Sequence, residues 1–165
     1  MDRLSGEIAV VTGSTAGGIG TSIARRFAEE GASVVVTGRR DDRGEAIAGS
    51  IRQAGGTAIF VRADLTERDD CAALFAETTR QVGPVTVLVN NAASDLITTD
   101  AVATDVKDET WADMFAVNVS GPLWMIQAAL PSMMRPVTAR SSTCRRARAC
   151  APGRARRRTA RARAR

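Results

Sequence analysis

Tyrosine and histidine are both absent from this chain of 165 residues, and aromatic residues make up only 4% of it. The chain therefore lacks two side chains that commonly serve as general acids and bases. Its three cysteines form neither a metal-binding pattern nor an even disulfide framework, which is typical of reduced thiols in a cytoplasmic protein. No apolar run approaches the roughly 18 residues of a membrane-spanning helix. The N-terminus also lacks the apolar core of a signal peptide. We therefore expect a cytoplasmic protein with no metal site and no membrane segment.

Acidic residues are absent from residues 135–165, which contain 12 arginines, whereas residues 1–134 contain 18 acidic and 11 basic residues. The net charge of +5 thus combines −7 in the first part with +12 in the second. The high pI belongs to the tail and does not indicate a basic protein throughout. The tail has no aromatic residue and one branched aliphatic residue, Val137, so it cannot offset the entropy of ordering. We predict a folded domain over residues 1–134 and a disordered Arg/Ala-rich tail over 135–165.

Short apolar segments alternate with amphipathic ones through the first part of the chain. Strands are predicted at residues 7–12, 33–37, 57–62 and 85–89, and helices at 18–30, 41–54, 67–82 and 105–134. The last of these is predicted as one helix broken near Gly121-Pro122 or as two short helices. Apolar strands without alternation suit a parallel sheet that is covered on both faces. The sequence therefore predicts an α/β fold, a Rossmann-like doubly wound parallel sheet truncated after about four strands.

A glycine-rich loop follows the first predicted strand and opens the first predicted helix. Its candidate phosphate-binding residues are Gly13, Ser14, Thr15, Gly18, Ile19 and Gly20. Glycine lets the backbone approach a pyrophosphate, and the helix offers free N–H groups and the positive end of its dipole. A purely structural turn is the alternative, but the position after the first strand favours a nucleotide-binding loop.

Three more segments follow the carboxyl ends of predicted strands, where ligands bind in this class of fold. Gly38 stands where dinucleotide folds often carry an acidic residue for the ribose hydroxyls, and Arg39 and Arg40 follow it. Arginine here suits a 2′-phosphate, which favours NADP(H) over NAD(H), although a solvated charge pair with the neighbouring aspartates is the alternative. The other two segments supply the candidate ligands Asp64 and Leu65, and Asn90, Asn91 and Ala92. In isolation these would be ordinary turn residues.

Together with Trp111 and the segment FAVNVSGP, these features resemble the short-chain dehydrogenase/reductase family over residues 4–134. The resemblance implies that the glycine loop and Asp64 hold the cofactor. It also implies that the Asn-Asn-Ala segment lines the adenosine side and braces the sheet. Asn118 matches the family asparagine that acts in a tetrad with Ser, Tyr and Lys, where it anchors a proton-relaying water. One departure is an extra residue between Gly13 and Gly18, which we expect to bulge the loop and weaken pyrophosphate binding.

The family's Ser and Tyr-x-x-x-Lys follow the helix that ends near Met134, and this chain has no Tyr and only one Lys, Lys107. The Arg/Ala-rich tail is typical of GC-rich DNA read out of register. With suitable free bases, the shifted codons of residues 137–146 read D-G-A-I-V-N-V-S-S, and those of 158–163 read Tyr-Gly-Ala-Ser-Lys. We therefore interpret the tail as a frameshift product. A genuine Arg-rich arm for nucleic acid or acidic membranes is the weaker alternative, because no aromatic residues interleave the arginines.

The sequence leaves three hypotheses. The first is a short-chain oxidoreductase lineage that transfers hydride between NADP(H) and a small carbonyl or secondary-alcohol substrate, with this product inactive. The second is a non-catalytic NADP(H)-binding or interaction module, and the third is a nucleic-acid-associated protein. Without the next strand, residues 85–89 are expected to form an open apolar edge that is prone to aggregation, and the family's homo-oligomer interface is expected to be lost.

Overall fold

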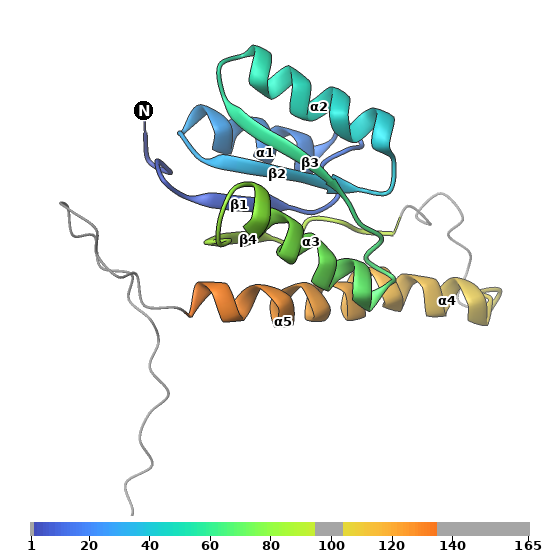
Figure 1. The fold of residues 1–165 in the computed structure, drawn as a ribbon. Coiled ribbons are helices and arrows are strands. Elements are labelled where there is room, and N and C mark those ends of the chain that lie inside the picture. The colour runs from blue at the N-terminus through green and yellow to red at the C-terminus, as the bar shows by residue number, and fades with distance from the viewer. Residues whose placement is uncertain (1, 95–103, 135–165) are drawn as a thin grey trace, which may run out of the picture. The chain divides into compact units, whose positions relative to one another are not determined.

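The computed structural model describes residues 2–94 and 104–134, which belong to one compact unit, Met1–Arg135. Strands and helices alternate along it (Figure 1). The strands are β1 (Ile8–Val11), β2 (Ser33–Gly38), β3 (Thr57–Arg62) and β4 (Val87–Val89). The helices are α1 (Ile19–Glu29), α2 (Asp41–Gln53), α3 (Arg68–Gln81), α4 (Asp108–Phe115), the π-helical turn η2 (Ala116–Ser120) and α5 (Gly121–Met133). The predicted disordered tail lies outside the described residues.

The four strands form one parallel sheet in the order β3-β2-β1-β4. Helices α1 and α2 cover one face, and α3 and α5 cover the other (Figure 1). From β1 the chain adds β2 and then β3 on one side of the sheet, and it later returns to add β4 on the other side of β1. The predicted Rossmann-like doubly wound α/β fold is therefore confirmed, and its ligand-binding edge lies at the carboxyl ends of the strands.

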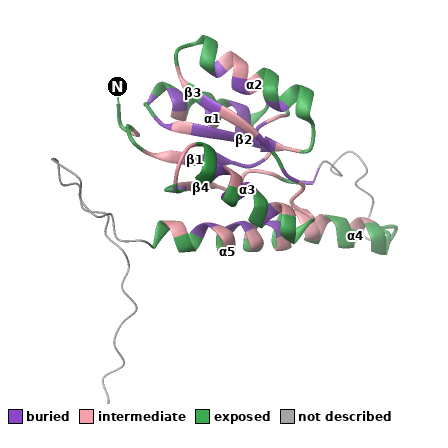
Figure 2. Cartoon of the chain, viewed as in Figure 1, coloured by how far each residue is buried: buried purple, intermediate pink, exposed green. Residues whose placement is uncertain are grey.

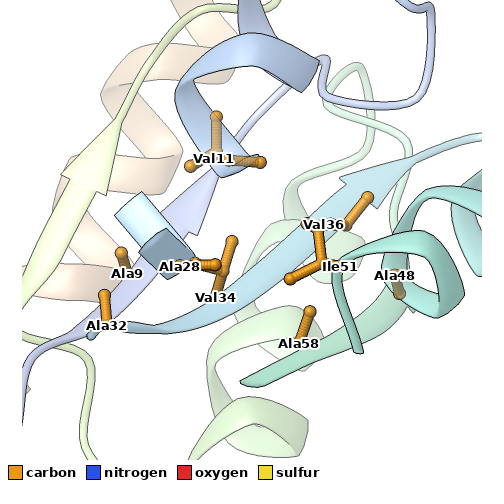
Figure 3. Packing of buried hydrophobic residues seen from close by; sticks show 10 residues of the cluster. Ala9, Val11, Ala28, Ala32, Val34, Val36, Ala48, Ile51 and Ala58 are labelled. Atoms are coloured by element: carbon orange, nitrogen blue, oxygen red, sulfur yellow. The ribbon is translucent and has the colours of Figure 1, made fainter. Parts of the chain in front are cut away.

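Both faces of the sheet are buried, which explains why its strands are continuously apolar (Figure 2). Val11 packs under α1 and α2, whereas the adjacent Val10 packs under α3 and α5, because successive side chains of a strand point to opposite faces. The first face is lined mainly by small residues, among them Ala28 of α1 and Ala48 of α2, which let these helices lie close to the sheet (Figure 3). The second face carries larger side chains, including Met125.

The last helical segment differs from the prediction of a break near Gly121-Pro122. Helices α4 and α5 follow one another through η2 without interruption (Figure 1). Pro122 has no N–H to donate to the carbonyl of Asn118, four residues earlier. The wider π-helical turn η2 directly precedes this position and accommodates the missing hydrogen bond, so the helix continues.

Strand β4 is shorter than predicted and forms one edge of the described sheet, with β1 as its only neighbour there. Its residues Val87–Val89 are half-buried. The continuous helical segment of α4, η2 and α5 carries a row of exposed large apolar side chains: Trp111, Phe115, Val119, Leu123, Ile126 and Leu130. Aggregation through this edge and loss of an oligomer interface stay predictions.

A small ion-pair cluster ties the N-terminal segment to the end of α1. Glu30, only 3% exposed, accepts a hydrogen bond of 2.7 Å from the Arg3 guanidinium and pairs with Arg26 through the same oxygen. The hydrogen bond from Arg3 is the main cause that lowers the pKa of Glu30 to about 2, against the opposing effect of burial. The folded carboxylate thus stays charged well below the pH at which the unfolded one is protonated, about 4.3.

Glu30→Gln is expected to destabilise the protein at pH 7 and to have a smaller effect near pH 3. A lowered folded pKa contributes stability above the unfolded pKa, and this contribution disappears as the pH falls from about 4 toward 2. Thermal unfolding of both proteins at the two pH values measures this. Glu29→Gln is the matched control, because Glu29 is exposed and, among the described residues, forms an ion pair with Arg26 but not with Arg3. An equal loss from Glu30→Gln at both pH values contradicts the expectation.

Candidate functional site

The loop after β1 is shaped by backbone that side chains would obstruct. Gly13 has a φ of +64°, and a Cβ there would lie 2.7 Å from the Cα of Ala92. A Cβ on Gly20 would lie 2.4 Å from the Asn91 amide nitrogen and 2.7 Å from the Gly13 carbonyl oxygen. The loop, the start of α1 and the segment after β4 therefore meet in close contact, as a nucleotide-binding loop requires.

The extra residue is accommodated by Gly17, which has a φ of +77° and open space around it. The Thr21 hydroxyl donates to the Ser14 carbonyl at 2.7 Å and accepts from the Gly17 N–H at 3.1 Å, so it closes the loop across its base. Gly18 is the N-cap of α1 and supplies no side-chain cap. The N–H groups of the first helical turn have no partner within the helix itself. The expected weakening of pyrophosphate binding stays a prediction.

Ser14 is turned away from the site. Its side chain is fully buried, donates to the Val11 carbonyl at 2.7 Å and accepts from the Thr37 N–H at 3.1 Å. The hydroxyl thus ties the loop to β2 and is not available to a phosphate. This arrangement could not be read from a serine in a glycine-rich loop, because either orientation fits the motif.

Asn91 joins β4 to the loop. Its amide nitrogen donates to the Thr12 carbonyl at 2.8 Å, while the N–H groups of Asn91 and Ala92 both donate to the Thr12 hydroxyl, at 2.9 and 3.0 Å. Asn90 is exposed. Within the Asn-Asn-Ala segment the bracing contacts therefore come from Asn91 and Ala92, which fix the spacing between the ends of β1 and β4.

At the end of β2, the exposed residues Arg39 and Arg40 follow Gly38, where the structure leaves no space for a side chain. An ideal Cβ on Gly38 would lie 2.5 Å from the Thr15 hydroxyl and 2.9 Å from its methyl carbon. A side chain at this position, including an acidic one, must displace Thr15. Arg39 and Arg40 form no ion pair within residues 2–94 and 104–134, so the neighbouring aspartates do not neutralise them in the described structure.

Asp64 is held in a tight turn after β3. Its carboxylate accepts hydrogen bonds from the Thr66 N–H at 3.0 Å and the Thr66 hydroxyl at 2.8 Å. Partial burial acts to raise the pKa of Asp64, but the Thr66 hydrogen bonds and the charges of Arg39 and Arg62 outweigh it, so the pKa lies below its usual value. Asp64 is therefore an anion at neutral pH, with Arg39 close enough to influence it.

These segments surround a cavity of about 730 Å³ at the carboxyl ends of the strands. Eight predicted site residues line it: Gly13, Thr15, Arg39, Arg40, Asp64, Leu65, Asn91 and Ala92. Six others do not: Ser14, Gly18, Ile19, Gly20, Asn90 and Asn118. Sequence reasoning missed several residues that line the cavity beside the motifs, namely Ala16, Thr37, Ala63, Thr66, Ala93 and Ser94, and also Asp113 and Val117 from the last helical segment. The volume is within the range of small-molecule and cofactor sites.

A family model for short chain dehydrogenases matches residues 7–142. The chain belongs to the short-chain dehydrogenase family. The NADP-dependent (R)-specific alcohol dehydrogenase of Lentilactobacillus kefiri is 44% identical over 122 residues, which cover 73% of this chain and 46% of that protein. The 3beta-hydroxysteroid dehydrogenase of Mediterraneibacter gnavus is 36% identical over 120 residues, which cover 73% of this chain and 42% of that protein. The chain thus spans about half the length of these curated relatives.

Solved structures show the same architecture. A metagenomic short-chain oxidoreductase in complex with NADP superposes with a TM-score of 0.73 at 36% identity, and the match covers 79% of this chain and 57% of that one. A hydroxysteroid dehydrogenase from Escherichia coli gives the same TM-score at 33% identity and is covered to 54%. At these identities the likeness supports both the fold and the family.

Asn118, the family's candidate catalytic residue in this chain, lies in η2 rather than in a regular helix. Its side-chain oxygen accepts a hydrogen bond of 2.9 Å from the Ser94 N–H and so links the last helical segment to the end of β4. The sequence could not show this partner. The proton-relay role implied by the family resemblance stays a prediction.

The described residues show neither a metal-binding cluster nor a membrane-spanning helix. No cluster of three or more potential metal ligands occurs among them. No helix in this part of the chain is long and apolar enough to cross a membrane.

Proposed function

We propose that this chain carries the NADP(H)-binding half of a short-chain oxidoreductase, over residues 1–134. In the intact enzyme the reaction is hydride transfer between nicotinamide C4 and a small carbonyl or secondary alcohol. This chain is proposed to bind the dinucleotide without turning it over, since the family's Tyr, its Lys four residues later and its Ser have no counterparts at the required positions. The observation that carries the proposal is the cavity at the strand ends, walled by the glycine loop, the β2 arginines and Asp64.

NADP(H) is proposed over NAD(H) because of the charge and the space at the end of β2. Arg39 and Arg40 line the cavity, are exposed and form no ion pair in the described structure, so we assign their guanidinium groups to a 2′-phosphate. Thr15 fills the space that an acidic side chain at Gly38 needs to reach the ribose hydroxyls. The names of two similar proteins, the NADP-dependent alcohol dehydrogenase and the NADP complex, support the same choice.

We assign a distinct role in dinucleotide binding to each of several groups of the chain. The N-terminus of α1 and the glycine loop face the pyrophosphate, whose charge the helix dipole favours. The anionic Asp64 and the backbone near Leu65 face the adenine, and Asn91 keeps the two halves of the cleft at a fixed separation. The bound nicotinamide ring supplies the hydride chemistry. In this chain Asn118 is the one member of the family tetrad that we assign.

Substituting both arginines, Arg39→Ala with Arg40→Ala, is expected to weaken NADPH binding about 10- to 100-fold and to leave NADH binding nearly unchanged. Hydrogen bonds to a charged group contribute about 1.5–3 kcal/mol, and NADH lacks the 2′-phosphate. Calorimetric titration with each cofactor measures this. Arg43→Ala is the matched control, because Arg43 lies on α2, is exposed and is not part of the cavity wall. An equal loss of NADH binding contradicts the assignment of the arginines to the 2′-phosphate.

Residues 135–165 are proposed to arise from a shifted reading frame rather than to form a functional arm. The similarity to curated relatives supports this, because it covers 73% of the chain for the alcohol dehydrogenase and 81% for a 2,5-dichloro-2,5-cyclohexadiene-1,4-diol dehydrogenase, so part of the chain has no counterpart in either match. Resequencing the gene from the Met133 codon onward tests the proposal. A missing or extra base near Arg135, followed by Tyr-x-x-x-Lys in the other frame, supports it. A verified printed frame overturns it and favours the non-catalytic binding module.

A further inference from the structure

Thr37 has a buried hydroxyl without a partner in the cavity wall. The residue is the penultimate one of β2, is 1% exposed and belongs to the lining of the 730 Å³ cavity. Its side-chain oxygen makes no hydrogen bond within residues 2–94 and 104–134. A buried polar group without a partner costs free energy, so such a group calls for an explanation.

The neighbouring hydroxyls do not share this feature. Those of Thr12, Ser14 and Thr21 are also buried, and they donate to the carbonyls of Val89, Val11 and Ser14 respectively. The Thr37 backbone is itself engaged, because its N–H donates to the Ser14 hydroxyl. Thr37 is therefore the exception in a region where the structure otherwise satisfies its buried hydroxyls.

The fold itself gives no reason for threonine at this position. The three preceding residues of β2, Val34–Val36, are buried valines, and a fourth valine has nearly the same shape as threonine without the unpaired hydroxyl. Thr37 is also next to Gly38 and the two arginines proposed to hold the 2′-phosphate. A partner for its hydroxyl is thus best sought in the adenosine half of a bound nucleotide.

We propose that the Thr37 hydroxyl is a hydrogen-bonding contact for the adenosine half of the dinucleotide, presented at the cavity wall by a change of χ1 rotamer. The inference rests on the proposed function and adds a residue to its binding site. Threonine has staggered χ1 alternatives, and a new hydrogen bond repays the change of rotamer. The Thr37 hydroxyl, which is unpaired among the described residues, becomes paired in the complex.

The test uses the full 165-residue chain and adenosine 2′,5′-bisphosphate as the probe, with calorimetric affinities and thermal unfolding of the ligand-free protein. Thr37→Val is expected to unfold at the same or a higher temperature than the parent chain, because it removes an unpaired buried hydroxyl. It is also expected to bind the probe about 3- to 10-fold more weakly, the range of one neutral hydrogen bond. Thr37→Ser keeps the hydroxyl and is expected to bind within about twofold of the parent, on the same reasoning.

Three outcomes overturn the inference, and they are distinguishable. Unchanged affinity of Thr37→Val, with binding by the parent chain intact, removes Thr37 from the site and leaves the proposed function standing. A lower unfolding temperature of ligand-free Thr37→Val shows that the hydroxyl already has a partner without the nucleotide. Failure of the parent chain to bind the probe at all overturns the proposed function and this inference together.

Discussion

Gly20→Ala is expected to abolish nucleotide binding and to lower the free energy of unfolding by about 1–3 kcal/mol, the usual cost of overpacking. The added methyl group would lie 2.4 Å from the Asn91 amide nitrogen and 2.7 Å from the Gly13 carbonyl oxygen. The backbone at Gly13 or Gly20 must then move, and this movement strains the hydrogen bond from the Asn91 amide to the Thr12 carbonyl. Helix propensity alone favours alanine over glycine by about 1 kcal/mol, so the close contact decides the sign.

Gly18→Ala is the matched control for this substitution. Gly18 lies two residues earlier, has no atom within 4 Å of an ideal Cβ, and does not have a positive φ. Its substitution is expected to leave the free energy of unfolding nearly unchanged, so it isolates the steric effect at Gly20. Denaturant unfolding and NADPH titration of the two variants measure the difference. If Gly20→Ala proves as stable as Gly18→Ala and still binds NADPH, the close approach of loop, helix and β4 is not what shapes the site.

The 165-residue chain is expected to bind NADPH yet to reduce carbonyl substrates at least about 100-fold more slowly than a full-length short-chain reductase. A positioned general acid contributes about 10²- to 10⁴-fold, and this chain contains neither a tyrosine nor a histidine to supply one. Stopped-flow and steady-state measurements of NADPH oxidation with a panel of ketones and aldehydes test this. The comparison protein is the product of the same gene with the reading frame restored near Arg135.

Sustained NADPH oxidation by the 165-residue chain, linear in enzyme concentration and saturable in substrate, contradicts this expectation. It requires a proton donor that the family resemblance does not provide. If the restored-frame product binds NADPH but does not oxidise it, the frameshift is not the reason for inactivity, and a non-catalytic module is favoured.

Much of the fold could be predicted because its signals are local. The helix over residues 41–54 and the strand over 57–62 lie within a residue of their observed limits, since Asp41 begins one and glycines separate them. The position of the cavity could also be predicted, because the carboxyl ends of parallel strands share one edge of a sheet.

The remaining features depend on contacts between distant residues, which a sequence pattern does not specify. The inward turn of Ser14, the packing of Thr15 on Gly38 and the bond from Ser94 to Asn118 each join different elements. The π-helical turn was mistaken for a break because Pro122 indicates a missing hydrogen bond but not how the chain compensates for it.

The central claim is that this chain retains an NADP(H) site at the strand ends. Parallel calorimetric titrations of the 165-residue chain with NADPH and NADH test it most directly. The account predicts one site that binds NADPH at least about tenfold more tightly than NADH, as expected for one charge-assisted contact or more to the 2′-phosphate. No binding of either cofactor, or equal affinity for both, would contradict it.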